Sequence, residues 1–491
     1  MWSMMTTVLA KTLSFVAQIV LGWQLSKGDF GVYAIAMSAA SFAFALRDGG
    51  LWQVLIARGS REYETLAGPI FWLGIWASVT IGVLLVAAAP VIALLYHDPR
   101  LTWLIIVIAV SWPLSSPCWV PRARLVVELR FKELGACQMI ASVLRYGSMI
   151  TFAACGFGPM SFVLPLLVAA ISDNVTALWF TRERAWLRSA NVRSWGPLLA
   201  EGTWCVVGTI ANSSLEMGVY LVMGAVATKD EIGKAEVGLY YFAYQLVAQT
   251  GALLAANVQG VLLPTLSRID EDVPRRRRAA IRSLSALMAV SAPASIGLAV
   301  VFPPLERIVW HGKWSDALWP VLVLGVAYPF RAIFALPVML EMSQRHFKRA
   351  ALMTLATGAA LMLAGGVAAA VRPSAACVAP ATGTVLVIAS LFWTARTFAR
   401  MHVPLRAILA TTGLAWVVAL LCGAAAFGAD FLLAEKGVND IARAVCVGAL
   451  FAGSFAVVAR LFLSHTLRDL VSTGPAGLRA PLSRALLLTR A

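Results

Sequence analysis

The sequence contains little charge and no long polar segment. Of its 491 residues only 13% are charged, whereas 60% are hydrophobic, and the mean hydropathy is +0.80. A soluble protein of this length needs far more charge to cover its surface. Apolar runs of about 20 residues, each long enough to cross a bilayer, recur from one end of the chain to the other. The composition therefore excludes a soluble protein and indicates an all-α polytopic membrane protein.

Motifs of several other protein classes are missing as well. The seven cysteines form no CxxC pair and the five histidines are scattered, so we expect no disulfide framework and no metal site. The GxxxxGKS/T motif, which binds nucleotide phosphates in P-loop proteins, is absent, and nothing else in the sequence indicates a cofactor. Asp270-Glu271-Asp272 only superficially resembles the acidic metal motif of a glycosyltransferase, because an Arg cluster and no catalytic domain surround it. We therefore predict no catalytic residues and no enzyme.

The apolar runs define fourteen candidate membrane spans. They are residues 3–25, 30–57, 66–96, 101–121, 134–153, 159–180, 198–227, 236–265, 280–302, 317–341, 350–371, 375–395, 405–428 and 440–463. The first span is expected to be retained, because it lacks the basic n-region and cleavage site of a signal peptide. The loops are short, so we expect function to reside within the bundle or at its mouths.

The basic residues predict the orientation of these spans. The segments on the same side as the amino terminus hold 27 Lys and Arg residues, the opposite loops hold nine, and four lie inside spans. Basic residues concentrate in cytoplasmic loops, so both termini are predicted to be cytoplasmic. The net charge of +16 is then mostly a topology signal, and we expect no nucleic-acid partner. The run Arg275–Arg278, with Arg282, is expected to lie on anionic headgroups.

Three sets of residues recur in the same order in the second half of the chain. At an offset of 216 the matches are Trp112-Pro113 with Tyr328-Pro329, Pro121 with Pro337, and Phe131-Lys132 with Phe347-Lys348. At offsets of 207 and 210 the matches are Gly31-Val32-Tyr33 with Gly238-Leu239-Tyr240, and Gly50 and Arg58 with Gly260 and Arg268. The matched spans are the second with the eighth and the fourth with the tenth, so the repeat unit is six helices.

A six-helix repeat predicts two parallel lobes, because an even number of helices preserves orientation. The predicted domains are an N-terminal lobe (1–190), a C-terminal lobe (191–400), two accessory helices (401–463) and a basic cytoplasmic tail (464–491). In transporters built this way the substrate binds between the lobes near the middle of the bilayer, and alternating access comes from rocking one lobe against the other. The repeated prolines are expected to kink their spans.

Polar side chains inside the spans are the candidate site residues, because such groups are costly in a bilayer and usually face a bundle interior or a cavity. The basic and amide groups suited to an anionic, hydroxyl-rich ligand are Lys11, Gln18, Arg47, Arg145, Arg331, Gln245 and Gln249. The acidic groups able to couple a proton or sodium ion are Asp48, Asp173 and Glu216. The alternative for each residue is a helix-helix hydrogen bond or a buried pair, such as Arg145 with Asp173.

The stretch entering the second span resembles a known family. Leu25-Ser26-Lys27-Gly28-Asp29-Phe30-Gly31-Val32-Tyr33 is close to an L-x-P-x-D/E-F-G-x-Y signature, and Leu46-Arg47-Asp48-Gly49-Gly50-Leu51 corresponds to the D-x-G-L-like turn after it. These features are similar to those of the polysaccharide-transport (Wzx-type) flippases of the multidrug/oligosaccharidyl-lipid/polysaccharide exporter superfamily. Lys27 stands where the family often has proline, and the usual basic segment before the first helix is missing, which makes a start upstream of Met1 one interpretation.

The resemblance implies a flippase of the bacterial inner membrane. Its substrate would be an undecaprenyl-diphosphate-linked oligosaccharide for lipopolysaccharide or exopolysaccharide biosynthesis. By analogy with lipid II flippases, the residues that contact the headgroup would be Lys11, Arg47, Arg145 and Arg331. The polyprenyl tail would stay in the lipid. The expected protein is a monomer whose partners are the lipid-linked oligosaccharide, membrane lipids, a polysaccharide polymerase and export proteins.

Three alternatives stay open at this point. A multidrug/cation antiporter of the same superfamily would favour acidic and aromatic residues, whereas the predicted cavity is basic. A membrane-embedded polysaccharide polymerase or ligase needs a catalytic loop on the outer face, and the longest outer loops, 228–235, 306–316 and 429–439, are short. A structural membrane protein would not need charges inside the membrane.

Overall fold

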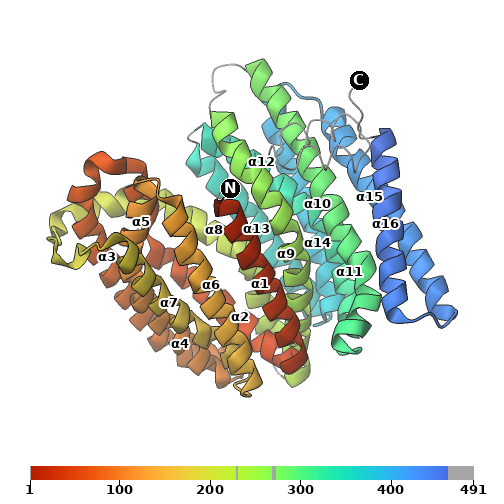
Figure 1. The fold of residues 1–491 in the computed structure, drawn as a ribbon, viewed down its shortest axis with the longest axis horizontal. Coiled ribbons are helices and arrows are strands. Elements are labelled where there is room, and N and C mark those ends of the chain that lie inside the picture. The colour runs from red at the N-terminus through yellow and green to blue at the C-terminus, as the bar shows by residue number, and fades with distance from the viewer. Residues whose placement is uncertain (1, 228–229, 268–272, 345, 463–491) are drawn as a thin grey trace. The chain divides into compact units, whose positions relative to one another are not determined.

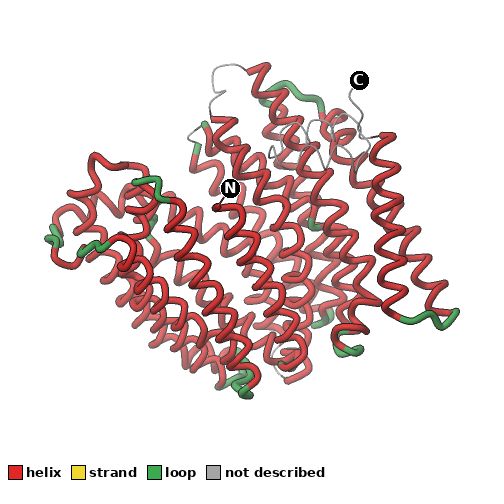
Figure 2. Tube along the Cα trace, in the orientation of Figure 1, coloured by secondary structure: helices red, strands yellow, loops and turns green. Residues whose placement is uncertain are grey.

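The computed structural model describes residues 2–227, 230–267, 273–344 and 346–462, and all regular secondary structure in this part is helical (Figures 1 and 2). The predicted all-α fold is thereby confirmed. The helices of the first half are α1 (Trp2–Gln24), α2 (Lys27–Asp48), α3 (Leu51–Leu95), α4 (Arg100–Ser115), α5 (Trp119–Val127), α6 (Phe131–Ala154), α7 (Met160–Thr181), α8 (Trp195–Ala227) and α9 (Glu231–Ser267). Those of the second half are α10 (Val273–Trp310), α11 (Leu318–Ala327), α12 (Pro329–Ser343), α13 (Phe347–Val371), α14 (Ala375–Ala399), α15 (Leu405–Glu435) and α16 (Asp440–Phe462).

The helices match the predicted spans in position. Each of the fourteen predicted segments overlaps a helix or a pair of consecutive helices in the described residues. Among these residues, eleven segments are long and apolar enough to cross a membrane by length and composition. The helices α1, α6 and α9 are not among the eleven, so the membrane protein is established as multi-spanning while the count of fourteen stays a prediction.

The chain groups into two compact units. The first unit holds the residues up to Tyr241 together with Thr354–Val378, and the second holds Phe242–Met353 together with the described residues from Ala379 onward. The predicted lobes and accessory helices are defined by the repeat and not by packing, so their boundaries stay a prediction. The predicted tail lies outside the described residues.

Both ends of α2 are fixed by local sequence. Ser26 Oγ accepts a hydrogen bond from the backbone N–H of Asp29 at 3.1 Å, and the backbone N–H of Ser26 donates to Asp29 Oδ2 at 2.9 Å, which forms a capping box. The helix ends at Asp48 because Gly49 and Gly50 have φ values of 57° and 69°, a left-handed conformation that favours glycine. The second predicted span is therefore too long at its carboxyl end.

The turn between α2 and α3 packs on α8 through backbone contacts. A Cβ atom on Gly202 of α8 would lie 1.9 Å from the carbonyl oxygen of Gly49, and one on Gly50 would lie 2.6 Å from Cys205 Cβ. No side chain fits at these distances, so glycine is required on both sides of the contact.

The fourth and tenth predicted spans are interrupted helices. In the fourth, the 3₁₀ turn η1 (Ser116–Cys118) separates α4 from α5, and in the tenth, α11 ends at Ala327 before α12 begins at Pro329. Proline lacks the N–H donor that would continue the helical hydrogen bonds, which accounts for interruptions near the repeated prolines. The expected distortion of these two spans is confirmed.

In the second unit, α10 packs against α15 and α16 around an apolar core that includes Leu284, Ala415 and Phe451. A buried ion pair joins α15 to α16 within this unit. Arg443 Nε and Nη2 donate to the two carboxylate oxygens of Asp430 at 3.1 and 2.9 Å, and the two side chains are only 4% and 7% exposed. Such a forked geometry satisfies both charges away from water.

We predict that Asp430→Ala destabilises the protein, because it removes the forked partner of the buried Arg443 guanidinium and leaves only the ion pair with Asp440 at 2.7 Å. The loss is expected to be smaller than the roughly 3–5 kcal/mol that an entirely unpaired buried charge costs. Thermal unfolding of the purified protein in detergent would measure the loss. Glu435→Ala, at the exposed end of the same helix, is the matched control and is expected to be near neutral. Equal melting temperatures for the two variants would contradict a structural role for the pair.

Candidate functional site

The helices α2 and α9 cross at two glycines in the first unit. A Cβ atom on Gly31 would lie 2.0 Å from the carbonyl oxygen of Lys234, and one on Gly238 would lie 1.9 Å from the carbonyl oxygen of Lys27. Lys27 and Lys234, like Gly31 and Gly238, are separated by 207 residues. The contact is therefore reciprocal, with the same two positions of the predicted repeat facing each other backbone to backbone.

An aromatic layer follows directly after this crossing. The ring of Tyr33 stacks on Phe162 with centroids 4.2 Å apart and meets Tyr241 edge-on at 5.7 Å. Tyr220 of α8 in turn meets Tyr241 at 5.3 Å. Because Tyr33 and Tyr241 come two and three residues after the crossing glycines, the rings fill the space immediately beyond the backbone contact.

An ion-pair network lies at the beginning of the same two helices. Lys234 Nζ of α9 lies 3.0 Å from Asp98 Oδ2 and 2.9 Å from Glu231 Oε1, and Arg100 Nη2 lies 2.8 Å from Asp98 Oδ2. Asp98 and Lys234 are 3% and 7% exposed. Arg100 Nη1 also approaches Asp29 Oδ1 at 3.9 Å. These five residues, Asp29, Asp98, Arg100, Glu231 and Lys234, are named here the α9 network.

The α9 network keeps its central carboxylate ionised. Burial alone would raise the pKa of Asp98, but hydrogen bonds from Arg100 and Lys234 outweigh it and hold the pKa below its ordinary value. For Lys234, burial opposes the charge, while Glu231 and Asp98 together raise the pKa above its ordinary value. Both members of the Asp98–Lys234 pair are thus charged at neutral pH.

Arg47 is surrounded by hydroxyl groups and aromatic rings within the first unit. Its Nε donates to Ser78 Oγ at 2.9 Å, and its Nη2 donates to Ser115 Oγ at 2.9 Å and to the carbonyl of Trp112 at 3.2 Å. The guanidinium carbon is 4.5 Å from the centroid of the Trp119 ring. With 2% exposure, Arg47 contacts protein on all sides, so its proposed headgroup contact stays a prediction.

A second polar cluster joins α5, α6 and α7. Asp173 Oδ2 lies 3.2 Å from Arg122 Nη1, and Arg145 interacts electrostatically with both Asp173 and Tyr33. The direct ion pair of Asp173 is thus with Arg122, while Arg145, the partner that the sequence suggests, interacts with the same carboxylate electrostatically. Arg145 Nε and Asp173 Oδ1 are buried and have no hydrogen-bond partner among the described residues. Since buried polar atoms are nearly always satisfied, these two atoms are available to water or to polar groups of a ligand.

Sequence reasoning missed Arg122, Asp98 and Lys234. The apolar pattern predicts a span that ends at Pro121 and a loop at Arg122, whereas α5 continues through Arg122. For Lys234 the pattern predicts an outer loop, whereas the residue lies in α9. The repetition of lysine and glycine at one offset, Lys27 to Gly31 and Lys234 to Gly238, is the signal that indicates the α9 crossing.

The structure distributes the remaining predicted residues over several helices. Lys11 and Gln18 are partly buried on α1, which packs against α6, and Glu216 is exposed on α8. Asp48 is the last residue of α2, and its side chain lies outside the described part. Gln245 and Gln249 on α9 and Arg331 on α12 are partly buried residues of the second unit, so a cavity shared with the first-unit residues stays a prediction. All seven cysteines are free, and Cys155 and Cys446 are exposed.

Comparison with known proteins identifies the family. The model of a family described as polysaccharide biosynthesis protein matches residues 20–319. This chain belongs to that family. Its relatives include the succinoglycan biosynthesis transport protein ExoT of Rhizobium meliloti and the lipopolysaccharide biosynthesis protein WzxC of Escherichia coli K12. Each is 24% identical over 66% of this chain and 64% of the relative, so the match spans a little less than two thirds of either protein.

Solved structures of the same fold are flippases and transporters. The lipid II flippase MurJ in an inward closed conformation has a TM-score of 0.73 and 12% identity, over 95% of this chain and 99% of that one. An inward-facing multidrug resistance MATE transporter has a TM-score of 0.61 and 14% identity, over 80% and 94%. These similarities confirm the transporter fold and the resemblance seen around the second span. ExoT, MurJ and the MATE protein are named as a transport protein, a flippase and a transporter, and none of these names is that of an enzyme.

We predict that Gly238→Ala lowers the melting temperature, because its methyl group would collide with the fixed backbone at Lys27 and force α9 away from α2. Gly147→Ala is the matched control, since a Cβ at that helical position would meet nothing within 4 Å. Thermal unfolding in detergent would measure both. A Gly238→Ala variant as stable as Gly147→Ala would contradict the backbone contact.

The lowered pKa of Asp98 predicts a pH dependence. A carboxyl whose folded-state pKa is lowered stabilises the fold above its ordinary value of 3.8, and this contribution is lost as the pH falls through the folded-state pKa. We therefore expect wild type to be more stable than Asp98→Asn at pH 7, with the difference shrinking below pH 3.8. Melting temperatures measured from pH 7 to pH 3 test this, and a constant difference would contradict it.

Proposed function

We propose that this protein is a flippase that translocates undecaprenyl-diphosphate-linked oligosaccharide across the bacterial inner membrane for lipopolysaccharide or exopolysaccharide biosynthesis. Membership of the polysaccharide biosynthesis family, relatives named as transport proteins, and the MurJ-like fold support this proposal. The single observation that carries it is the polar cluster of Arg122, Arg145 and Asp173 within the first unit.

The charge of this cluster favours an anionic ligand. Two guanidinium groups share one carboxylate, which leaves a net positive charge, and Arg145 Nε retains donor capacity among the described residues. Guanidinium forks match the paired oxygens of a diphosphate, whereas a site for cationic drugs needs net negative charge. The cluster thus supports the flippase over the multidrug/cation antiporter.

In the proposed headgroup site, Arg145 binds phosphate oxygens. Asp173 orients Arg122 through their ion pair. The further proposed contacts are Lys11 and Gln18 of α1, and Arg331, Gln245 and Gln249 of the C-terminal lobe. Arg47 is also a proposed contact, but its hydrogen bonds hold α2 against α3 and α4, so a headgroup would have to replace some of them. The polyprenyl tail stays in the lipid throughout.

The proposed coupling residue is Asp173, with Asp48 and Glu216 as further candidates. Protonation of Asp173 would change the net charge of its cluster from one to two positive charges, so the affinity for a diphosphate would follow its protonation state. A sodium ion bound at the Asp173 carboxylate would likewise add one positive charge to the cluster and raise its affinity for a diphosphate.

The crossing of α2 and α9 supports alternating access. The glycine contact, the aromatic layer and the α9 network all lie where these two helices begin. By the distribution of Lys and Arg this end faces outward and both termini are cytoplasmic. Opening toward the outer leaflet would separate α2 from α9 and break the Asp98–Lys234 ion pair.

Restoration of surface polysaccharide in a bacterial strain lacking its own flippase tests the function and the site. Wild type is expected to restore it. Arg145→Gln is expected to reduce it by about tenfold or more, because a charge-assisted hydrogen bond contributes about 1.5–3 kcal/mol. The other site variants are Asp173→Asn, Lys11→Ala and Arg331→Ala, and Arg193→Gln in an exposed 3₁₀ turn is the matched control.

The outcomes separate the function from the site. Failure of wild type in several polysaccharide backgrounds, at confirmed expression, would contradict the flippase. Full restoration by all four site variants would contradict only the headgroup site. Arg47→Ala serves as a structural comparison, since it is expected to lower the melting temperature as well as export, whereas Arg145→Gln is expected to lower export alone.

A further inference from the structure

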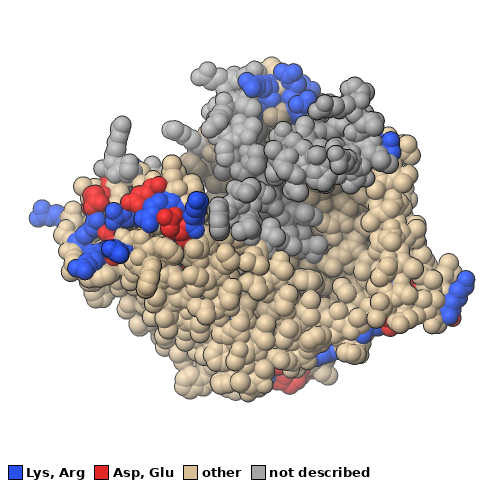
Figure 3. Space-filling view, in the orientation of Figure 1, with Lys and Arg blue, Asp and Glu red and all other residues tan. Residues whose placement is uncertain are grey.

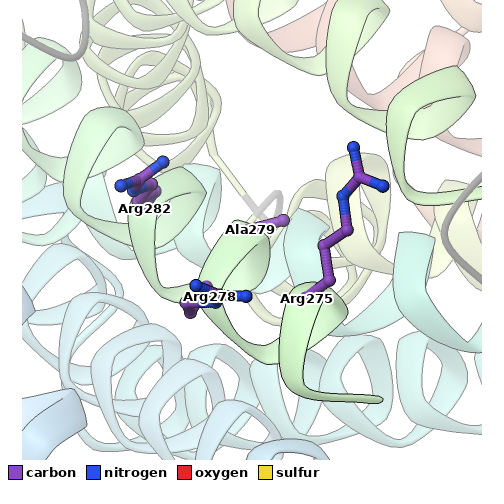
Figure 4. Close-up of a pocket in the computed structure, with 4 residues that line it drawn as sticks. All are labelled: Arg275, Arg278, Ala279 and Arg282. Carbon is purple, nitrogen blue, oxygen red and sulfur yellow. The ribbon is translucent and has the colours of Figure 1, made fainter. Parts of the chain in front are cut away.

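The amino end of α10 presents three arginines on one face. Arg275, Arg278 and Arg282 are exposed and follow one another at intervals of three and four residues, which places them on a single side of the helix. Figure 4 shows these three side chains with Ala279 between them. Together the four residues line a hollow of about 350 Å³ in the second unit, within the range of small-ligand sites.

The sequence predicts that this face lies at the level of lipid headgroups. The helix α10 carries a segment, Pro274–Trp310, that is long and apolar enough to cross a membrane, and the three arginines occupy its first turns. Figure 3 shows basic side chains gathered at this end of α10. The distribution of Lys and Arg predicts that the end is cytoplasmic, so its neighbours are headgroups of the inner leaflet.

The number and spacing of the arginines indicate the kind of anion. Arg275 and Arg282 are separated by about 10 Å along the helix, and long side chains from one face can converge on a group between them. A phosphodiester carries one negative charge and two free oxygens. A diphosphate diester carries two negative charges and four free oxygens, which is a closer match for three guanidinium forks in one hollow.

We propose that the hollow formed by Arg275, Arg278 and Arg282 is a loading site for the diphosphate of a polyprenyl-linked lipid in the cytoplasmic leaflet. The site shares no residue with the Arg122, Arg145 and Asp173 cluster and rests on the proposed function only for the identity of the natural ligand. It captures the headgroup at the membrane surface while the polyprenyl chain remains in the bilayer.

The experiment measures binding and not transport. Full-length protein in phosphatidylcholine nanodiscs is titrated with polyprenyl diphosphate carrying a single sugar, which is a diphosphate diester, and in a second arm with phosphatidylglycerol, which supplies a single phosphodiester. Arg278→Gln is expected to weaken diphosphate binding about tenfold, and Arg275→Gln with Arg282→Gln more than that. Arg278→Lys tests the forked contact, because it keeps the charge but loses bidentate geometry.

The matched control is Arg277→Gln, which removes an equal charge from another face of the same helix. Undiminished diphosphate binding by the Arg275/Arg282 double variant would overturn the site. An equal loss with Arg277→Gln would also overturn it, since binding would then follow the general positive field. Equal affinity for phosphatidylglycerol and polyprenyl diphosphate would overturn the assignment to a diphosphate. Binding with the expected pattern but without restored export would contradict the proposed function and leave the site intact.

Discussion

The membrane leaves this fold no water with which to satisfy polar groups, so each interruption of a helix needs a partner inside the protein. The break between α4 and α5 shows how this is done. The carbonyl of Trp112 at the break accepts hydrogen bonds from Arg47 Nη2 and from Ser115 Oγ, at 3.2 and 2.9 Å. Arg47 in turn is held by Ser78 and by the ring of Trp119. The Arg47 guanidinium therefore supplies a hydrogen bond that the interrupted helix needs. The carbonyl at the interruption in turn supplies an acceptor that the buried guanidinium needs.

Backbone contacts make α2 the central helix of the first unit. At its start Gly31 meets Gly238 of α9, and at its end Gly49 meets Gly202 of α8. A contact between two backbones has no flexible side chain that can absorb a shift, so α2 either stays in place or separates from α9 as a rigid element. The ion pairs of the α9 network lie beside one of these contacts. The strength of these ion pairs then influences how readily the whole of α2 separates from α9, and not only the position of a local loop.

The sequence predicted the helices well because bilayer thickness sets the length of an apolar run. The predictions were wrong where a helix end depends on backbone conformation, or where the burial of a residue depends on a partner far away in the sequence. Hydropathy continues past Asp48, and only the left-handed backbone at Gly49 and Gly50 ends α2 there. A predicted loop lysine, Lys234, is buried by Asp98, which is 136 positions away and shares no local pattern with it. The sequence predicts the same role, contact with the headgroup, for Arg47, Arg145 and Arg331, although the surroundings of these arginines differ.

The difference between those arginines indicates what a ligand site requires. Arg47 is 2% exposed and its donors point at hydroxyls, a carbonyl and rings, so a ligand would have to replace contacts that also hold three helices together. Arg145 shares the single carboxylate of Asp173 with Arg122, and its Nε lacks a hydrogen-bond partner among the described residues. The proposed headgroup would satisfy a donor there that has no hydrogen bond among the described residues. Residual hydrogen-bonding capacity, more than the presence of charge, is therefore the property that distinguishes a binding arginine from a structural one.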